Sequence, residues 1–344
     1  MREIYRILDA NFNRAREALR VAEDCGRFAL NDVAITVMAK HMRSDLQGLL
    51  SDIPLMEMVA SRDTPGDIGT DLTSPTELKR ADMNDVAIAA MKRLGESLRS
   101  IEEYSKVVAP AKTLDIERMR YNAYTLEQRL LGRLFVRRFF ADIHLYVLVD
   151  SSMCRGSVRE IARAAIAGQT DVVQVREKNI PDSQFLALAA EMRDLTDETG
   201  KMLIINDRAD IAAMVGADGL HVGQHDLPVA EARRLLRPGA LIGKSTHTIE
   251  QARAAVTEGA DYIAVGPIFA TATKDAGPPV GVELLKQILA EVQVPVVPVG
   301  GITAANVAQI RAAGATRAAV CSGVICAENP RTAAQHIRDT LTQA

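Results

Sequence analysis

The feature that most limits the fold is a regular alternation of strand-like and helix-like segments after residue 142. Short runs rich in β-branched residues recur there, and Ala-rich stretches with helical spacing lie between them. Eight such strands alternating with helices over about 200 residues predict an α/β fold, a (β/α)8 TIM barrel. The strand candidates are His144–Val149, Val172–Arg176, Leu203–Asn206, Gly219–Val222, Leu241–Lys244, Tyr262–Gly266, Val296–Val299 and Ala318–Cys321, and the helix candidates are 183–199, 228–237, 248–258, 281–291 and 303–313.

The residues after the first expected strand argue against the main alternative fold. A doubly wound open sheet usually has fewer strands, and a GxGxxG fingerprint follows its first strand. Here the corresponding residues are Asp150-Ser151-Ser152-Met153. The barrel is therefore the favoured fold for residues 139–344.

The N-terminal part of the chain follows a different pattern, with helical periodicity and almost no strand-like runs. Apolar residues recur mostly three or four positions apart in 6–30, 85–108 and 114–140, which is the spacing of one face of a helix. Residues 61–76 are rich in Pro, Gly, Asp, Ser and Thr, a composition that predicts a loop. We therefore expect an all-α domain at 1–138 that precedes the barrel.

A charged pattern occurs twice in this helical part. Arg and Glu three positions apart lie side by side on a helix, so one interpretation is a solvated face with local ion pairs. The other interpretation is a pair of helices that present Arg side chains to phosphate. The first is favoured because charged helix faces are usually solvated. The pattern Arg14, Glu17, Leu19, Arg20 and Glu23 recurs as Arg93, Glu96, Leu98, Arg99 and Glu102.

Composition and charge exclude several classes of protein. Residues 1–140 contain 22 Lys and Arg against 21 Asp and Glu, and residues 141–344 contain 19 against 23, so neither part has the basic surplus of a nucleic-acid or membrane-surface binder. The four cysteines form no CxxC pair, and no run approaches the roughly 18 apolar residues of a membrane span. We expect a cytoplasmic protein that binds neither nucleic acid nor membranes, and the sequence leaves open whether it forms a homo-oligomer.

Residues at the end of the second expected strand indicate an anion site. The active-site groups of a barrel lie at the C-terminal ends of its strands and in the loops that follow. Alternation along the strand places Gln174, Arg176 and Lys178 on one side, and two neighbouring cations favour a bound phosphate. The alternative is that Glu177 and neighbouring acids neutralise these cations at the rim.

Two carboxylates follow the third and fourth expected strands. Asp207, beside Asn206, and Asp226 lie at adjacent strand ends facing the basic second strand, which suits a Mg²⁺ ion bridging to phosphate oxygens. The alternative is that both carboxylates cap the helices that follow. His221 and His225 have no third zinc ligand of the right type nearby, so His221 is expected to pack or to form hydrogen bonds.

The loops after the last three expected strands suit phosphate binding as well. Residues 270–279 carry two Thr and one Lys, and they predict either a lid over phosphate or an ordinary surface loop. Glycine-rich turns follow the seventh and eighth strands, and each is expected to open a helix and to bind phosphate through main-chain amides. A cationic site with metal ligands beside an amide site indicates a transferase that joins two phosphorylated small molecules. The residues concerned are Thr271, Thr273, Lys274, Gly300, Gly301, Ser322 and Gly323.

Together these residues resemble the thiamine phosphate synthase family across 142–330. The resemblance implies a transferase that condenses 4-amino-2-methyl-5-hydroxymethylpyrimidine diphosphate with hydroxyethylthiazole phosphate, and that releases thiamine phosphate and pyrophosphate with the help of Mg²⁺. The implied reaction needs no protein nucleophile, because the aminopyrimidine carries the cation that the thiazole nitrogen attacks. The matching stretches are QVREK (174–178), IINDRADIA (204–212), ADGLHVGQHDLP (217–228), IGKSTHT (242–248), GADYIAVGPIFATATKDAG (259–277) and VPVGGIT (297–303).

The resemblance also implies a role for individual side chains. The diphosphate would bind to Gln174, Arg176, Lys178, Asn206 and Lys274, and Mg²⁺ would bind to Asp207 and Asp226. The side chains of Ser245, Thr271 and Thr273 would contact substrate. The thiazole phosphate would bind at Gly301 and Ser322, with Gly300 and Gly323 beside them. Lys244 and His225 receive no role.

The helical segment 6–28 resembles an extension that precedes the synthase in some bacterial lineages, from a family associated with phosphorylating hydroxymethylpyrimidine phosphate. It has no GxxxxGK[ST] loop, so a kinase would need another kind of nucleotide site. A docking or dimerising module is the alternative. For the barrel, the alternatives are a thiazole tautomerase relative and a non-catalytic sensor of thiamine intermediates. Neither needs both the cationic groups and the metal ligands, so their joint presence favours the synthase.

Overall fold

The computed structural model describes residues 1–49, 53–69, 79–271 and 277–343. The chain forms two compact units, Met1–Phe135 and Val136–Ala344. The boundary lies close to the division after residue 138 that the sequence predicts. A long helix, α5 (Thr113–Ala141), begins in the first unit and ends in the second.

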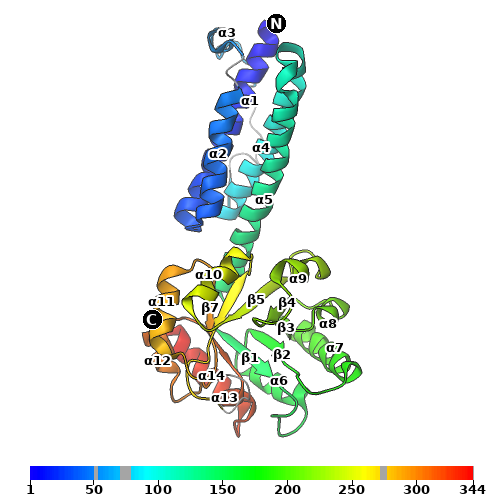
Figure 1. Cartoon of the computed structure of the whole chain (residues 1–344), viewed down its shortest axis with the longest axis vertical. Coiled ribbons are helices and arrows are strands. Elements are labelled where there is room, and N and C mark those ends of the chain that lie inside the picture. Colours follow the sequence, from blue (N-terminus) through cyan, green and yellow to red (C-terminus); the bar gives the residue numbers. More distant parts are fainter. Residues whose placement is uncertain (50–52, 70–78, 272–276, 344) are drawn as a thin grey trace. The chain divides into compact units, whose positions relative to one another are not determined.

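The first unit is helical, as expected from its periodicity (Figure 1). Helix α1 packs against α2 and α4, and the apolar residues that fill the space between helices include Leu8, Leu19, Leu94 and Leu98, all fully buried. The sequence pattern did not separate α2 and α3 as elements, and of the expected loop only 61–69 lies within the described residues. The elements before α5 are α1 (Arg2–Asp24), a π-helical turn (Cys25–Ala29), α2 (Val33–Leu49), α3 (Leu55–Ala60), α4 (Met83–Val108) and a 3₁₀ turn (Pro110–Lys112).

The second unit contains eight parallel strands in the order β7-β6-β5-β4-β3-β2-β1-β8. A parallel bridge between Val299 and Ala319 joins the last two neighbours, β7 and β8, and closes the sheet. The predicted (β/α)8 barrel is thereby confirmed, and every expected strand is present. The strands are β1 (Leu145–Val149), β2 (Val172–Val175), β3 (Met202–Asn206), β4 (Gly219–Val222), β5 (Leu241–Thr246), β6 (Tyr262–Val265), β7 (Val296–Pro298) and β8 (Ala318–Val320).

Helices cover the outer face of this barrel, where their apolar faces bury the outward residues of the strands. The sequence indicated five of them and missed α6, α8, α13 and α14. Two of the missed helices have six residues or fewer, too short for a periodic pattern. Among the described residues, no helix has the length and apolar character that crossing a membrane requires. The helices are α6 (Val158–Ala167), α7 (Asp182–Thr199), α8 (Ala209–Met214), α9 (Val229–Leu235), α10 (Ile249–Thr257), α11 (Gly281–Glu291), α12 (Val307–Ala312), α13 (Ser322–Ile325) and α14 (Pro330–Thr342).

The last turns of α5 close the N-terminal end of the barrel. Phe140 is 2% exposed, and its ring centroid lies 5.2 Å from that of Tyr262, the first residue of β6. Val136 belongs to the same buried cluster. Arg317 donates hydrogen bonds from Nη2 to the Phe140 carbonyl (2.9 Å) and from Nε to the Ile143 carbonyl (3.2 Å), which fixes the chain as it enters β1.

This packing predicts where the barrel can be separated from the helical unit. A fragment of residues 136–344 retains Val136 and Phe140, whereas a fragment of residues 142–344 lacks both. Because Phe140 is buried, its loss should lower the free energy of unfolding by about 3 kcal/mol or more. Urea unfolding followed by circular dichroism measures the difference. Equal midpoints for the two fragments would show that the end of α5 does not stabilise the barrel.

Candidate active site

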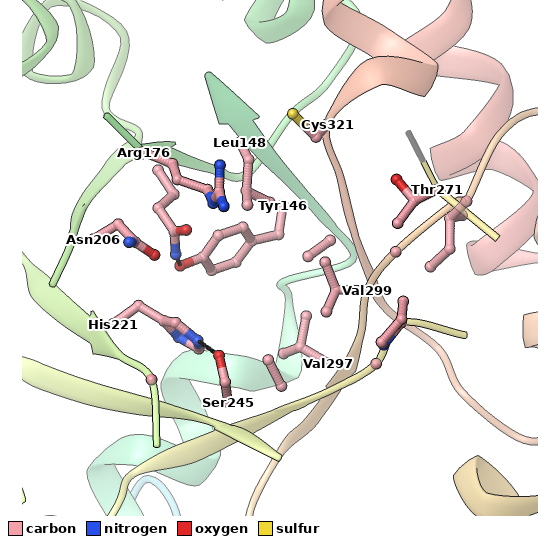
Figure 2. A pocket seen from close by; sticks show the side chains of 18 of the residues that line it. Tyr146, Leu148, Arg176, Asn206, His221, Ser245, Thr271, Val297, Val299 and Cys321 are labelled. Atoms are coloured by element: carbon pink, nitrogen blue, oxygen red, sulfur yellow. Dashed lines mark hydrogen bonds between the residues drawn. The ribbon is translucent and has the colours of Figure 1, made fainter. Parts of the chain in front are cut away.

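A cavity of about 270 Å³ opens at the C-terminal ends of the strands (Figure 2). The structure brings together at this cavity predicted residues from strands and loops that lie far apart in the sequence. Gly323 lies beside the lining residue Ser322 without lining the cavity itself. Thr273 and Lys274 lie outside the described residues. The predicted residues that line the cavity are Gln174, Arg176, Lys178, Asn206, Asp207, Asp226, Ser245, Thr271, Gly300, Gly301 and Ser322.

The two cations after β2 pair with neighbouring acids, but not with Glu177. Arg176 Nη1 lies 3.3 Å from Asp150 Oδ2, and Lys178 Nζ lies 2.5 Å from Asp207 Oδ2. The alternative that Glu177 and neighbouring acids neutralise the cations is confirmed for the neighbouring acids, Asp150 and Asp207, and wrong for Glu177, whose carboxylate accepts hydrogen bonds from the amide and hydroxyl of Ser151. Alternation explains this, since Glu177 lies between the two cations in sequence and its side chain takes the opposite side.

Asp207 and Asp226 both line the cavity, and each carboxyl group shifts the pKa of the other. Asp207 has a φ of 61°, a left-handed conformation, and Asp226 Oδ2 accepts a hydrogen bond from the Gly223 amide at 2.7 Å. The alternative that both carboxylates cap helices is wrong. The N-cap residues of α8 and α9 are Arg208 and Pro228, and neither helix has a side-chain cap.

The electrostatics of this pair favour a cation. Burial raises the pKa of Asp207, and the neighbouring Asp226 carboxyl raises it further, while Lys178 opposes both effects. Burial also acts to raise the pKa of Asp226, but contacts with Asp207 and the Gly223 amide outweigh it and lower that pKa. Two neighbouring carboxylates repel each other unless a positive charge lies between or beside them. The oxygen donors of Asp207 and Asp226 therefore fit a hard divalent cation such as Mg²⁺.

A chain of hydrogen bonds crosses the inside of the barrel beneath these charged groups. Gln174 Nε2 donates to the Tyr146 hydroxyl (2.6 Å), which shares a hydrogen bond with the Tyr262 hydroxyl (2.9 Å). His221 continues the chain through Nδ1 to Tyr262 (3.1 Å) and through Nε2 to Ser245 Oγ (2.9 Å; Figure 2). Burial lowers the pKa of His221 to about 4, so its ring is neutral near pH 7. The prediction that His221 forms hydrogen bonds is confirmed.

Several residues at the cavity were not predicted. Tyr146 and Tyr262 occupy inward positions of β1 and β6, and strand alternation alone could have identified them. His247 also lines the cavity, and its Nδ1 lies 2.5 Å from the Gly266 carbonyl. Gln224 does not line the cavity, but its Nε2 donates to the carbonyl of Ser245, which does. Lys244, which received no role, is buried outside the barrel and pairs with Glu258.

The glycine turns after β7 and β8 bring main-chain amides to the same cavity. Gly301 has a φ of 66°, and a Cβ there would lie 2.4 Å from the Ala270 carbonyl oxygen. Within the described part of the chain, no hydrogen-bond acceptor faces the amides of Gly301, Ser322 and Gly323. Only the second turn opens a helix directly, since α13 begins at Ser322 whereas α12 begins at Val307. In the turn after β7, Asn306 Nδ2 donates a hydrogen bond to the Gly301 carbonyl (2.8 Å).

Family models match both units of the chain. A model described as thiamine monophosphate synthase matches residues 145–324, which is most of the barrel. A second model, described as the ThiD2 family, matches residues 6–129 of the helical unit.

Curated relatives match the chain over nearly its whole length. A thiamine-phosphate synthase of Nostoc punctiforme is 39% identical over 99% of this chain and 95% of its own length. One from Gloeobacter violaceus is 40% identical over 95% of this chain and 94% of its own length. The solved thiamine phosphate pyrophosphorylase of Pyrococcus furiosus is 33% identical and covers 58% of this chain and 95% of its own, with a TM-score of 0.54. The chain therefore belongs to the thiamine-phosphate synthase family of thiamine-biosynthesis enzymes.

Proposed function

We propose that the barrel condenses the hydroxymethylpyrimidine diphosphate with hydroxyethylthiazole phosphate, with Mg²⁺ bound at the cavity, to form thiamine phosphate and pyrophosphate. One observation carries the proposal. The acidic pair Asp207–Asp226 lies beside Arg176 and Lys178 in the same cavity that the amides of the β7 and β8 turns reach. A diphosphate and a second phosphate can therefore bind within one cavity.

The basic side binds the diphosphate in this proposal. Arg176 has a planar fork of donors that matches phosphate oxygens, and Lys178 supplies a mobile point charge. Its side chain is 48% exposed, so it can turn from Asp207 toward a ligand. Asn206, at the end of β3, adds an amide donor beside them. These donors stabilise the negative charge that develops on the departing pyrophosphate.

Asp207 and Asp226 would hold the metal ion on the same side of the cavity. When bound, Mg²⁺ neutralises charge on the pyrophosphate leaving group. Lys178, now paired with Asp207, would then be available to the diphosphate.

The inner wall of the cavity suits a cationic pyrimidine. Tyr146 and Tyr262 are buried, and burial raises the pKa of both hydroxyls, so neither becomes charged near pH 7. His221 is also neutral, because its pKa is about 4. A protonated imidazole here would repel a cation formed when the diphosphate leaves. Neutral hydrogen-bonding side chains orient the ring without that repulsion.

The thiazole phosphate would bind at the opposite side, on the amides of Gly301 and Ser322. Main-chain amides bind a phosphate dianion without a cationic side chain. Gly300 and Gly323 let the loops around this position approach closely, and Ser245 and Thr271 line the same cavity. The thiazole nitrogen would then face the carbon that loses the diphosphate.

Metal removal tests this proposal directly. Purified protein with both phosphorylated substrates is expected to release pyrophosphate with Mg²⁺ and to stop in EDTA, with recovery when excess MgCl₂ is restored. A coupled assay for pyrophosphate measures the rate. Equal release in EDTA would reject the metal role. A tautomerase relative or a sensor would release no pyrophosphate under either condition.

Two hypotheses compete for the role of the helical unit. In the first it phosphorylates hydroxymethylpyrimidine phosphate, and in the second it serves in docking or dimerisation. Full-length protein incubated with ATP, the pyrimidine monophosphate and the thiazole phosphate separates them. Only a kinase-bearing chain would form thiamine phosphate from this mixture. The docking hypothesis predicts no product but a smaller assembly for the fragment of residues 136–344 than for the whole chain.

A further inference from the structure

The helical unit contains the same charged arrangement twice, in α1–α2 and in α4–α5. In the first copy Glu23 lies between Arg20 (3.4 Å) and Arg43 of α2 (2.9 Å). In the second copy Glu102 lies between Arg99 (2.8 Å) and Arg120 of α5 (2.7 Å). The sequence repeat therefore corresponds to a structural repeat that extends into the second helix of each pair.

The glutamates of this repeat are not part of a solvated face. Glu23 is 5% exposed and Glu102 is 4% exposed, so the interpretation of a solvated face is wrong for these two residues. The local ion pairs that the same interpretation expects are present, Arg20 with Glu23 and Arg99 with Glu102. A buried carboxylate needs partners for its charge, and each has two arginines. Because both copies share this feature, we assign it to holding paired helices together.

The two copies differ beside this shared ion cluster. The first copy has a surface cavity of about 370 Å³, which we call the arginine cavity, lined by Asn13, Arg16, Glu17, Arg20 and Arg43. At the place of Arg16 the second copy has Gly95, and a Cβ on Gly95 would lie 3.7 Å from the Tyr124 ring.

Aromatic side chains occupy the second copy at this position. The Arg120 guanidinium carbon lies 4.8 Å from the Tyr121 ring centroid and 5.8 Å from that of Tyr124, and Arg120 Nη1 donates to the Tyr124 hydroxyl (3.2 Å). Counted from Arg43, the equivalent residues of the first copy are Ser44 and Gln47. The fold therefore does not require an open, arginine-lined cavity at this place.

We infer that the arginine cavity binds the phosphate group of a small phosphorylated molecule. Arg16 forms no ion pair within the described ranges and is exposed, so its guanidinium is available. Arg20 is 51% exposed and Arg43 is held by Glu23, so three guanidinium groups converge on one opening. Guanidinium forks match phosphate oxygens, and Glu17 can accept a hydrogen bond from a hydroxyl or amino group elsewhere on the ligand. This inference is independent of the barrel reaction.

Site-resolved arginine modification tests the inference in the full chain, where phosphate sites in the barrel would confuse a simple binding curve. The protein is treated with phenylglyoxal, and modification of each arginine is followed by mass spectrometry, in NaCl or in inorganic phosphate of equal ionic strength. Phosphate should slow the modification of Arg16 and Arg20 severalfold. The modification of Arg99, the counterpart of Arg20, should proceed at the same rate with and without phosphate. Absent protection, or equal protection at Arg99, would overturn the inference.

Two further arms identify the ligand class. Glycerol phosphate and ATP are compared with inorganic phosphate. If glycerol phosphate protects the arginines at a lower concentration than ATP does, the cavity is assigned to phosphate monoesters. If ATP protects them at a lower concentration than glycerol phosphate does, the cavity is assigned to a nucleotide triphosphate. Protection by neither compound, when inorganic phosphate protects, would reject a phosphorylated small molecule as the ligand.

Substitutions supply the matched control. Arg16→Gly copies the residue of the second repeat, and Arg16→Gln keeps helix propensity. Each should weaken phosphate protection of Arg20 by about tenfold, the scale for one charge-assisted hydrogen bond. Arg99→Ala should leave that protection unchanged, and all three variants should keep the barrel rate. Unaltered protection in both Arg16 variants would contradict the assignment.

Discussion

Asp207→Asn is expected to lower the rate of pyrophosphate release by about a hundredfold or more at fixed Mg²⁺, the scale for losing an electrostatic stabiliser. The substitution removes one of the two charges of the carboxylate pair and leaves Asp226 as the only anionic metal ligand of that pair. Raising the Mg²⁺ concentration should restore part of the rate, because the loss is mainly in ion binding. Steady-state rates across a Mg²⁺ titration measure both effects.

Asn is the appropriate replacement because Asp207 has a φ of 61°. Asn adopts the left-handed region more readily than most residues, whereas Ala would add backbone strain to the loss of charge. Asp210→Asn is the matched control, since Asp210 is 51% exposed and pairs with Arg208 without lining the cavity. It should keep the normal rate and Mg²⁺ dependence. A wild-type rate in Asp207→Asn would remove Asp207 from the metal site.

Most of the barrel could be predicted because its strands are short β-branched runs with turn residues between them. Each strand was located to within two residues at either end. The parallel arrangement then determines that residues at strand ends meet, which is why the sequence predicts that the cations after β2 face Asp207. The ion pair between Lys178 and Asp207 agrees with this. Local pattern and global topology agree in this part of the chain.

The interior of the barrel could not be predicted in the same way. The contact between Tyr146 and Tyr262 joins residues 116 positions apart, and no local pattern reports which inward side chains meet across a barrel. Phe140 was expected within a helix, but its burial at the end of the barrel depends on how α5 enters the second unit. The sequence also did not predict which hydrogen-bond partner each acid takes, because several acids lie at one rim. Glu177, for example, accepts a hydrogen bond from the Ser151 hydroxyl.

The close packing of the β7 and β8 turns explains why the amide site should be sensitive to one methyl group. Gly323 is not in the left-handed region, so alanine is compatible with its backbone. However, a Cβ there would lie 2.4 Å from the Ile302 carbonyl oxygen and 3.2 Å from Thr303 Cα. Backbone atoms cannot rotate away as a side chain can, so the loop after β7 must move, and the Gly301 amide moves with it.

Gly323→Ala is therefore expected to raise the KM for thiazole phosphate by about tenfold to a hundredfold, the scale for misplacing a binding group by about 1 Å. The KM for the pyrimidine diphosphate should stay the same, because Arg176 and Lys178 follow β2, and β2 does not pair with β7 or β8. Ser322→Ala, within the same proposed site, serves as the comparison, since it keeps the Cβ and the amide and removes only a hydroxyl. Steady-state kinetics with each substrate varied in turn measure the KM for thiazole phosphate and the KM for the pyrimidine diphosphate separately. Equal increases in both KM values would mean that the methyl group disturbs the whole barrel mouth, and an unchanged KM for thiazole phosphate would place that phosphate elsewhere.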